Sequence, residues 1–203
     1  MQTLRKTSIR RWRRALPRGL IVVGVLVLLA ACDRASGSAV AVSDAHPAAI
    51  MPSAANRAAS DYVDSVVGDE LFETRTAAIA ASRATDPDVK AYARLMARDY
   101  AASRADMTQA IAASAQDIAP PVVMSDHLQS MLDELGQGSG PNFDKTYIDQ
   151  QIEAQEETLG LTSAYAEGGA APSIKAAAGR LAPQIQAHLD QARAIEDALN
   201  KKL

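Results

Sequence analysis

Apolar and small residues recur at steps of three and four along most of the chain after residue 60, which is the period of amphipathic helices. The longest such stripe alternates steps of four and three through Ile174, Ala178, Leu181, Ile185, His188, Ala192, Ile195 and Leu199. A similar stripe runs through Val89, Ala93, Met96, Tyr100, Ser103, Met107 and Ile111. The pattern predicts four long helices and one short helix, over residues 60–85, 87–116, 125–135, 142–167 and 173–200.

Turn-forming residues separate the predicted helices. Asp86 followed by Pro87 is typical of a helix N-cap and the first helical position. Glycine-rich stretches at residues 136–141 and 168–169 predict two further helix ends. Pro183 falls inside the last segment, where it predicts a bend.

Composition favours helices throughout. Alanine accounts for 42 of the 203 residues, and aromatic residues make up only 4%. Alanine has the highest helix propensity, whereas strands favour β-branched and aromatic residues. We therefore expect an all-α fold, a four-helix bundle with one short extra helix in its middle connection.

The net charge of −3 conceals two different parts of the chain. Residues 1–31 carry seven basic side chains and no acidic one, which leaves 14 basic and 24 acidic side chains in the remainder. An acidic body repels the phosphates of nucleic acids, so we expect no nucleic-acid partner.

The first 31 residues are predicted to be a secretory signal peptide. Basic residues extend to Arg18, and Leu20–Ala31 is an uninterrupted run of twelve apolar or glycine residues. A membrane-spanning helix needs about twenty such residues, whereas a shorter run with a basic flank is typical of a signal peptide.

The apolar run ends in Leu29-Ala30-Ala31-Cys32, which contains the only cysteine and resembles the bacterial lipobox. The resemblance implies that the Cys32 thiol carries a lipid and becomes the new N-terminus. The alternative is an ordinary signal peptide with an incidental cysteine. Asp33 favours retention at the inner membrane, with the protein facing the periplasm. Residues 32–59 show no sustained period and are predicted to be a flexible tether, so the helical bundle is assigned to residues 60–203.

Three multi-residue segments are similar to motifs of one known family. They are Thr85–Met96, Phe143–Tyr147 and Leu181–Leu189, each in the order in which the family has them. The chain thus resembles domain-of-unknown-function family 4142 over about residues 60–196. This resemblance implies a ferritin-like fold in a secreted or envelope protein, without an agreed biochemical activity.

The same resemblance draws attention to four interior positions. The family has a Glu on the first helix and a His on each of the other three long helices. The matching residues here are Glu73, Tyr100, Gln155 and His188, so only the first and last keep the family's residue type. We expect these four side chains to form a polar cluster in the core.

In that cluster, Gln155 is expected to hydrogen-bond to its neighbours, and Glu73 to accept from Tyr100 and His188. The alternative is a divalent metal site or redox site that uses Glu73 and His188. Neighbours that could help to bind the metal are Asp99, Glu70 and Glu156. His127 is expected at the surface or at a helix cap.

No phosphate-binding glycine loop, paired cysteine or nucleophile elbow occurs in the sequence. We therefore expect no enzyme activity and no cofactor. The leading hypothesis is a lipoprotein of the bacterial envelope, attached to a membrane through Cys32, that acts by binding or scaffolding. The alternative is a ferritin-like metal-binding or redox protein.

Overall fold

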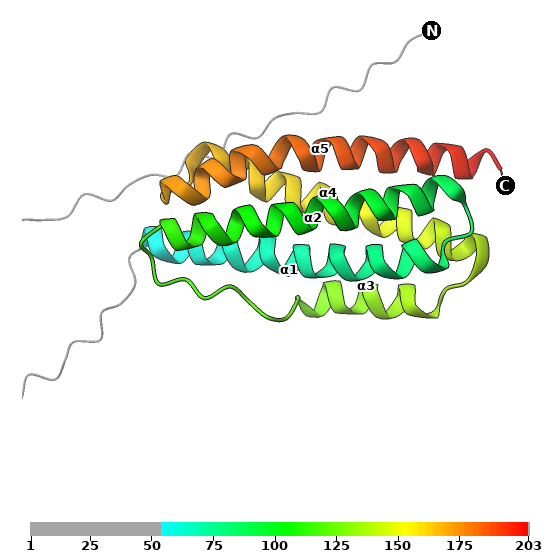
Figure 1. Ribbon diagram of the computed structural model, residues 1–203, viewed down its shortest axis with the longest axis horizontal. Coiled ribbons are helices and arrows are strands. Elements are labelled where there is room, and N and C mark those ends of the chain that lie inside the picture. Colours follow the sequence, from blue (N-terminus) through cyan, green and yellow to red (C-terminus); the bar gives the residue numbers. More distant parts are fainter. Residues whose placement is uncertain (1–53, 203) are drawn as a thin grey trace, which may run out of the picture. The chain divides into compact units, whose positions relative to one another are not determined.

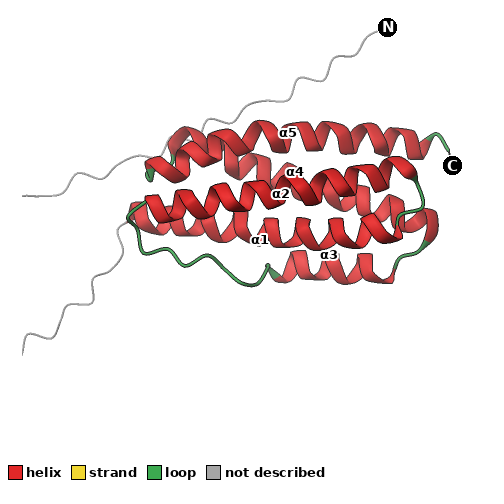
Figure 2. Ribbon diagram, viewed as in Figure 1, coloured by secondary structure: helices red, strands yellow, loops and turns green. Residues whose placement is uncertain are grey.

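The computed structural model describes residues 54–202, which form five helices and no strand (Figures 1 and 2). The helices are α1 (Ala54–Arg83), α2 (Pro87–Ala113), α3 (Asp126–Gln137), α4 (Gly140–Gly168) and α5 (Pro172–Asn200). The prediction of an all-α chain with four long helices and one short helix is therefore confirmed for this part of the sequence. The predicted signal peptide, Cys32 and most of the predicted tether lie outside the described residues.

Most helix boundaries lie within two residues of the predicted ones, and two differ by more. Helix α1 begins at Ala54 instead of Ser60, because residues 54–59 are rich in alanine and Ala59 is fully buried. Helix α2 ends at Ala113 instead of Gln116. It stops there because Ala115 adopts a left-handed conformation with a φ of 54°, which the helix cannot contain. Helix α5 continues through Pro183 without interruption.

Each of the four long helices packs against two of the others. Helix α1 contacts α2 and α4, and α5 contacts the same two helices from the opposite side (Figure 1). The short helix α3 lies outside this arrangement, against α1 and α4. Residues 114–125 connect α2 to α3 and allow the chain to return along the helical domain, which is the name used below for residues 54–202.

The core contains two main apolar clusters, with buried polar side chains between them. On α1 the first cluster ends at Val67 and the second begins at Ala77. The buried polar residues of α1 lie between these two positions: Asp69, Glu70, Glu73 and Thr76. The helices thus bring polar groups together near the middle of their length, where these side chains are almost fully buried.

Asp144 of α4 ties the loop between α1 and α2 to the rest of the domain. Its side chain is 1% exposed. Its carboxyl oxygens accept hydrogen bonds from the backbone N–H of Thr85 at 2.9 and 3.1 Å, from the N–H of Asp86 at 2.7 Å, and from the Thr85 hydroxyl. Asp86 in turn caps α2 by accepting from Asp88 and Val89.

Replacing Asp144 with alanine is expected to lower the free energy of unfolding by about 2–3 kcal/mol, because two partly buried N–H groups lose their acceptor. Urea denaturation monitored by circular dichroism measures this change. Asp149→Ala is the matched control on the same helix, since Asp149 forms only an exposed ion pair with Lys145. The control should change stability by less than about 0.5 kcal/mol. Equal effects of the two substitutions would contradict the structural role of Asp144.

Candidate functional site

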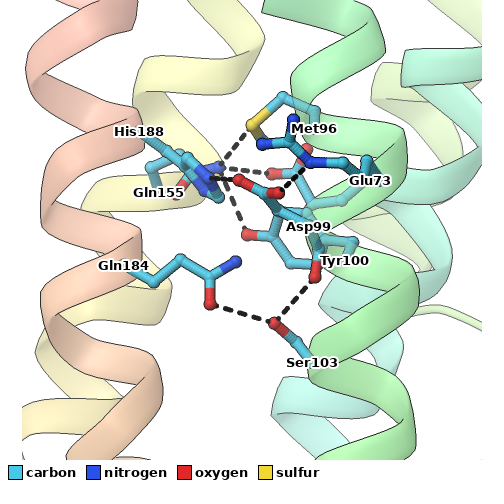
Figure 3. Close-up of polar contacts among 9 residues, drawn as sticks. Glu73, Met96, Asp99, Tyr100, Ser103, Gln155, Gln184 and His188 are labelled. Carbon is cyan, nitrogen blue, oxygen red and sulfur yellow. Dashed lines mark hydrogen bonds and ion pairs between the residues drawn. The ribbon is translucent and has the colours of Figure 1, made fainter.

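The four long helices each contribute one of the sequence-predicted residues to the middle of the core. Glu73 comes from α1, Tyr100 from α2, Gln155 from α4 and His188 from α5 (Figure 3). Their exposed fractions are 0%, 2%, 0% and 4%. We call the buried polar groups at this level the polar layer: Asp69, Glu70, Glu73, Thr76, Tyr100, Gln151, Gln155, Thr158 and His188.

Gln155 is the centre of the hydrogen bonding in the polar layer. Its Nε2 lies 3.3 Å from Oε1 of Glu73 and 3.2 Å from the hydroxyl oxygen of Tyr100. The same nitrogen lies 4.0 Å from the sulfur of Met96. The structure therefore brings three of the four predicted residues into direct contact through one side-chain amide.

His188 has a different partner from the one expected. Its Nε2 lies 3.1 Å from Oδ2 of Asp99, and no hydrogen bond joins it to Glu73 in the described residues. Its ring packs beside that of Tyr100, with centroids 5.9 Å apart and planes tilted by 34°. The prediction that Glu73 accepts hydrogen bonds from Tyr100 and His188 is therefore wrong. Gln155 is the donor to Glu73, and Asp99 is the partner of the imidazole.

Asp99 links the polar layer to the surface. Its burial opposes ionisation, but hydrogen bonds from Arg98 and His188 outweigh this effect and hold the pKa of Asp99 below its usual range. Arg98 Nε lies 2.8 Å from Oδ1 of Asp99. The charged end of the cluster is thus at the surface side of α2, away from Glu73.

Three carboxyl groups on α1 are buried without forming an ion pair in the part of the chain that the structure describes. No ion pair within residues 54–202 includes Asp69, Glu70 or Glu73. Burial raises the pKa of Asp69 to about 7, and the charge of Glu157 adds to the shift. Burial, together with the charge of Asp69, raises the pKa of Glu70 to about 8.

Burial, and to a smaller extent the charge of Asp69, raises the pKa of Glu73 well above its ordinary value. These shifts follow from the cost of placing charge in a medium of low polarity. Burial therefore favours the protonated, neutral form of the Glu73 carboxyl group.

Several atoms of the polar layer have no hydrogen-bond partner among the protein groups described. They are Oδ2 of Asp69, both carboxyl oxygens of Glu70, Oε2 of Glu73, the amide oxygens of Gln151 and Gln155, and Nδ1 of His188. Leaving such an atom unpaired in a core costs about 1–3 kcal/mol. The polar layer therefore reduces the stability of the domain. Natural cores contain few such atoms, and those present call for an explanation.

The four predicted residues do not form a good set of metal ligands. Burial raises the pKa of Tyr100 well above its ordinary value, so the phenol stays neutral and is a poor ligand. Burial favours the protonated form of Glu73, Gln155 offers only a neutral amide oxygen, and the Nε2 of His188 is engaged by Asp99. In addition, residues 54–202 contain no group of three or more His, Cys, Asp or Glu residues arranged to hold a metal ion.

The other candidate residues lie outside the polar layer. Glu156 is exposed and forms an ion pair with Arg193 at 2.6 Å. His127 is also exposed, as predicted, with its Nε2 3.3 Å from Oε1 of Glu153. Sequence reasoning did not identify Asp69, which is 4% exposed. The signal available was its spacing of four residues before Glu73, which places both carboxyl groups on one face of α1.

The fold and the polar layer place this chain in the class of all-helical proteins with titratable groups in the core. The profile of one family, described as a domain of unknown function (DUF4142), matches residues 44–195. The chain belongs to this family, as its motifs indicated. No curated protein and no solved structure matches the chain. Within the described residues, no helix has the length and apolar character needed to cross a membrane.

The raised pKa of Asp69 predicts how the stability of the folded chain changes with pH. An acid whose pKa is higher in the folded chain than in the unfolded chain contributes stability at low pH, and this contribution is lost as the pH rises through about 7. Between about pH 5.5 and 8, the wild-type chain should lose roughly 2 kcal/mol more stability than Asp69→Asn, which cannot ionise. Urea denaturation at a series of pH values measures both curves.

Asp61→Asn is the control for this experiment, because Asp61 is an exposed acid on the same helix. The Asp61→Asn variant should keep the wild-type pH profile. Parallel pH profiles for the wild-type chain and Asp69→Asn would contradict the assignment of a buried, titrating carboxyl group at residue 69.

Proposed function

We propose that this protein is a lipid-anchored component of the bacterial cell envelope, whose ferritin-like four-helix bundle acts by binding or scaffolding and not by catalysis. The observation that carries the proposal is the hydrogen bonding and the raised pKa values of the side chains in the polar layer. Gln155 holds Glu73 and Tyr100 by hydrogen bonds, and burial raises the pKa values of both the carboxyl group and the phenol. No nucleophile paired with a base, the usual arrangement for covalent catalysis, occurs among these groups.

The arrangement of the long helices supports the description as a four-helix bundle. Helices α1, α2, α5 and α4 are joined into a closed ring of neighbours, and α3 lies outside it. In ferritin-like folds, metal ligands project inward from the four helices at one level. Here the side chains at that level are Glu73, Tyr100, Gln155 and His188, which suit a hydrogen-bonded core better than a metal centre.

The sequence supports the anchor. The apolar run of twelve residues ends in Leu29-Ala30-Ala31, directly before Cys32, and residues 33–53 separate Cys32 from the first described helix. A lipid on Cys32 would hold the helical domain near a membrane surface. A single acyl chain binds membranes weakly, whereas several chains give stable attachment. The proposed partner is therefore the membrane itself, on the periplasmic side.

Cys32→Ala tests the anchor. In cells that express the full chain, the wild-type protein should sediment with membranes, dissolve only with detergent and carry an acyl modification detected by mass spectrometry. The Cys32→Ala variant should be soluble or remain unprocessed at its larger mass, because the nucleophilic thiol is absent. Ser36→Ala is a control close to the same site. An unmodified wild-type Cys32, or a fully processed Cys32→Ala that still sediments with membranes, would contradict the proposal.

A second candidate function is metal binding at Glu73 and His188. It is favoured by two unpaired atoms, Oε2 of Glu73 and Nδ1 of His188, which keep lone pairs available for a ligand. Incubation with iron, zinc, copper or manganese, followed by metal analysis of the purified protein, separates the two functions. The proposed binding or scaffolding role predicts no stoichiometric metal and a melting temperature unaffected by chelators.

A double substitution shows whether the residues at positions 100 and 155 decide if the core binds a metal ion. Tyr100→His with Gln155→His restores the His residues that the family resemblance implies at these positions. We expect the double variant to bind about one zinc ion per chain, since three imidazoles and a carboxylate form a suitable donor set. Stoichiometric metal in the wild-type protein would favour the second candidate function instead.

A further inference from the structure

A cleft of about 180 Å³ lies between α1, α3 and α4, on the outer side of the helical domain. It exists because the short helix α3 covers α1 and α4 over only part of their length. The cleft is distinct from the centre of the polar layer, but the two meet at Asp69, which forms part of the cleft wall.

The walls of this cleft combine negative charge with apolar surface. Asp64 and Glu157 line it as exposed acids, and Asp69 lines it as a buried acid. Leu128 and Leu161 contribute apolar surface, and no lysine or arginine is among the lining residues. The cleft therefore offers a surface complementary to a positively charged group on a carbon chain.

Besides the charge and apolar surface of the cleft, the carboxyl group of Asp69 points to a ligand. Its side chain is 4% exposed, and its Oδ2 has neither a hydrogen-bond partner nor an ion pair in residues 54–202. The hydroxyl groups of Thr158 and Tyr100 favour its charged form, but burial dominates and raises its pKa. A cation placed against this carboxyl group would replace the proton that burial otherwise retains.

We propose that this cleft binds a small alkyl diamine. One ammonium group pairs with the carboxylate of Asp69, the carbon chain lies against Leu128 and Leu161, and the second ammonium group lies between Asp64 and Glu157. The proposal gives a ligand class to the binding role inferred above and rests on that role.

The size of the cleft suits this class of ligand. A cavity of about 150 Å³ holds a molecule of about six heavy atoms. A cleft of about 180 Å³ therefore accommodates 1,4-diaminobutane, which has about that number. A metal ion fits less well, because the described residues contain no group of three or more His, Cys, Asp or Glu side chains arranged to hold one.

Binding of the diamine should depend on pH. The groups that surround Asp69 are Asp64, Glu70 and Glu73 on its own helix, Tyr100 on α2, His127 on α3, and Glu157 on α4. His127 already faces Glu153, so it does not neutralise Asp69. The ammonium group displaces the proton of Asp69, so affinity should rise as the pH increases through about 7.

Isothermal titration calorimetry of the full chain, purified in detergent, tests the proposal with 1,4-diaminobutane as the probe. We expect one diamine per chain at about pH 8, with affinity about tenfold lower at about pH 6. Butane-1,4-diol, the uncharged analogue, should not bind.

Three variants complete the experiment. Asp69→Asn should weaken diamine binding at least about tenfold, and circular dichroism checks that this variant remains folded. Glu157→Gln changes an exposed side chain and should weaken binding about threefold. Asp61→Asn, which lies outside the cleft, should bind like the wild-type chain.

Three results would each overturn the proposal: no binding by the wild-type chain, unchanged affinity in Asp69→Asn, or equal binding of the diol. These results are independent of the anchor, because the Cys32→Ala variant retains the cleft and should bind the diamine normally. Failure of diamine binding would therefore remove the ligand assignment, whereas failure of the fractionation experiment would remove the membrane attachment.

Discussion

Desolvation of the carboxyl groups of Asp69, Glu70 and Glu73 is the constraint on which the interior of this protein depends. All three lie on α1, between the two main apolar clusters, and none forms an ion pair within residues 54–202. Charged carboxylates at this depth would oppose the packing of α2 and α4 against α1. The folded chain meets this constraint by keeping protons on these groups, as the raised pKa values of Asp69 and Glu70, about 7 and about 8, indicate.

The contacts of Gln155 and His188 follow from the same constraint. A neutral Glu73 needs a hydrogen-bond donor and not a counter-ion, and the amide of Gln155 supplies one while also reaching Tyr100. The ionised carboxylate, Asp99, lies nearer the surface, where Arg98 and His188 both contact it. The core thus has protonated-acid chemistry favoured in its interior and an ionised carboxylate at its edge, and the four predicted residues are arranged for hydrogen bonding.

The sequence predicted the fold more completely than the site. The alternating steps along residues 174–199 and 89–111 are a local property, so they were sufficient to predict α5 and most of α2. The early start of α1 was missed because residues 54–59 lack large apolar side chains, and burial of Ala59 depends on the packing of other helices. The end of α2 was missed because it depends on the left-handed conformation of Ala115.

The sequence predicted which four residues meet in the candidate site, but not which of them contact one another. The family resemblance indicated all four residues, although only His188 lies within one of the three similar segments. The partner of His188 depends on how far α2 and α5 are rotated about their axes, which a periodic pattern does not specify to one residue. Asp69 was missed because acidic residues usually mark the solvated face of a helix. Glu70 was named only as a neighbour that could help to bind a metal.

The central claim is that the core holds neutral carboxylic acids near neutral pH, and NMR titration of the Glu73 carboxyl carbon tests it most directly. The resonance can be assigned by its absence in Glu73→Gln. The structure predicts that the chemical shift changes at a pH well above the ordinary pKa of 4.5, because burial raises the pKa of this carboxyl group. A normal titration near 4.5 would contradict this account of the core.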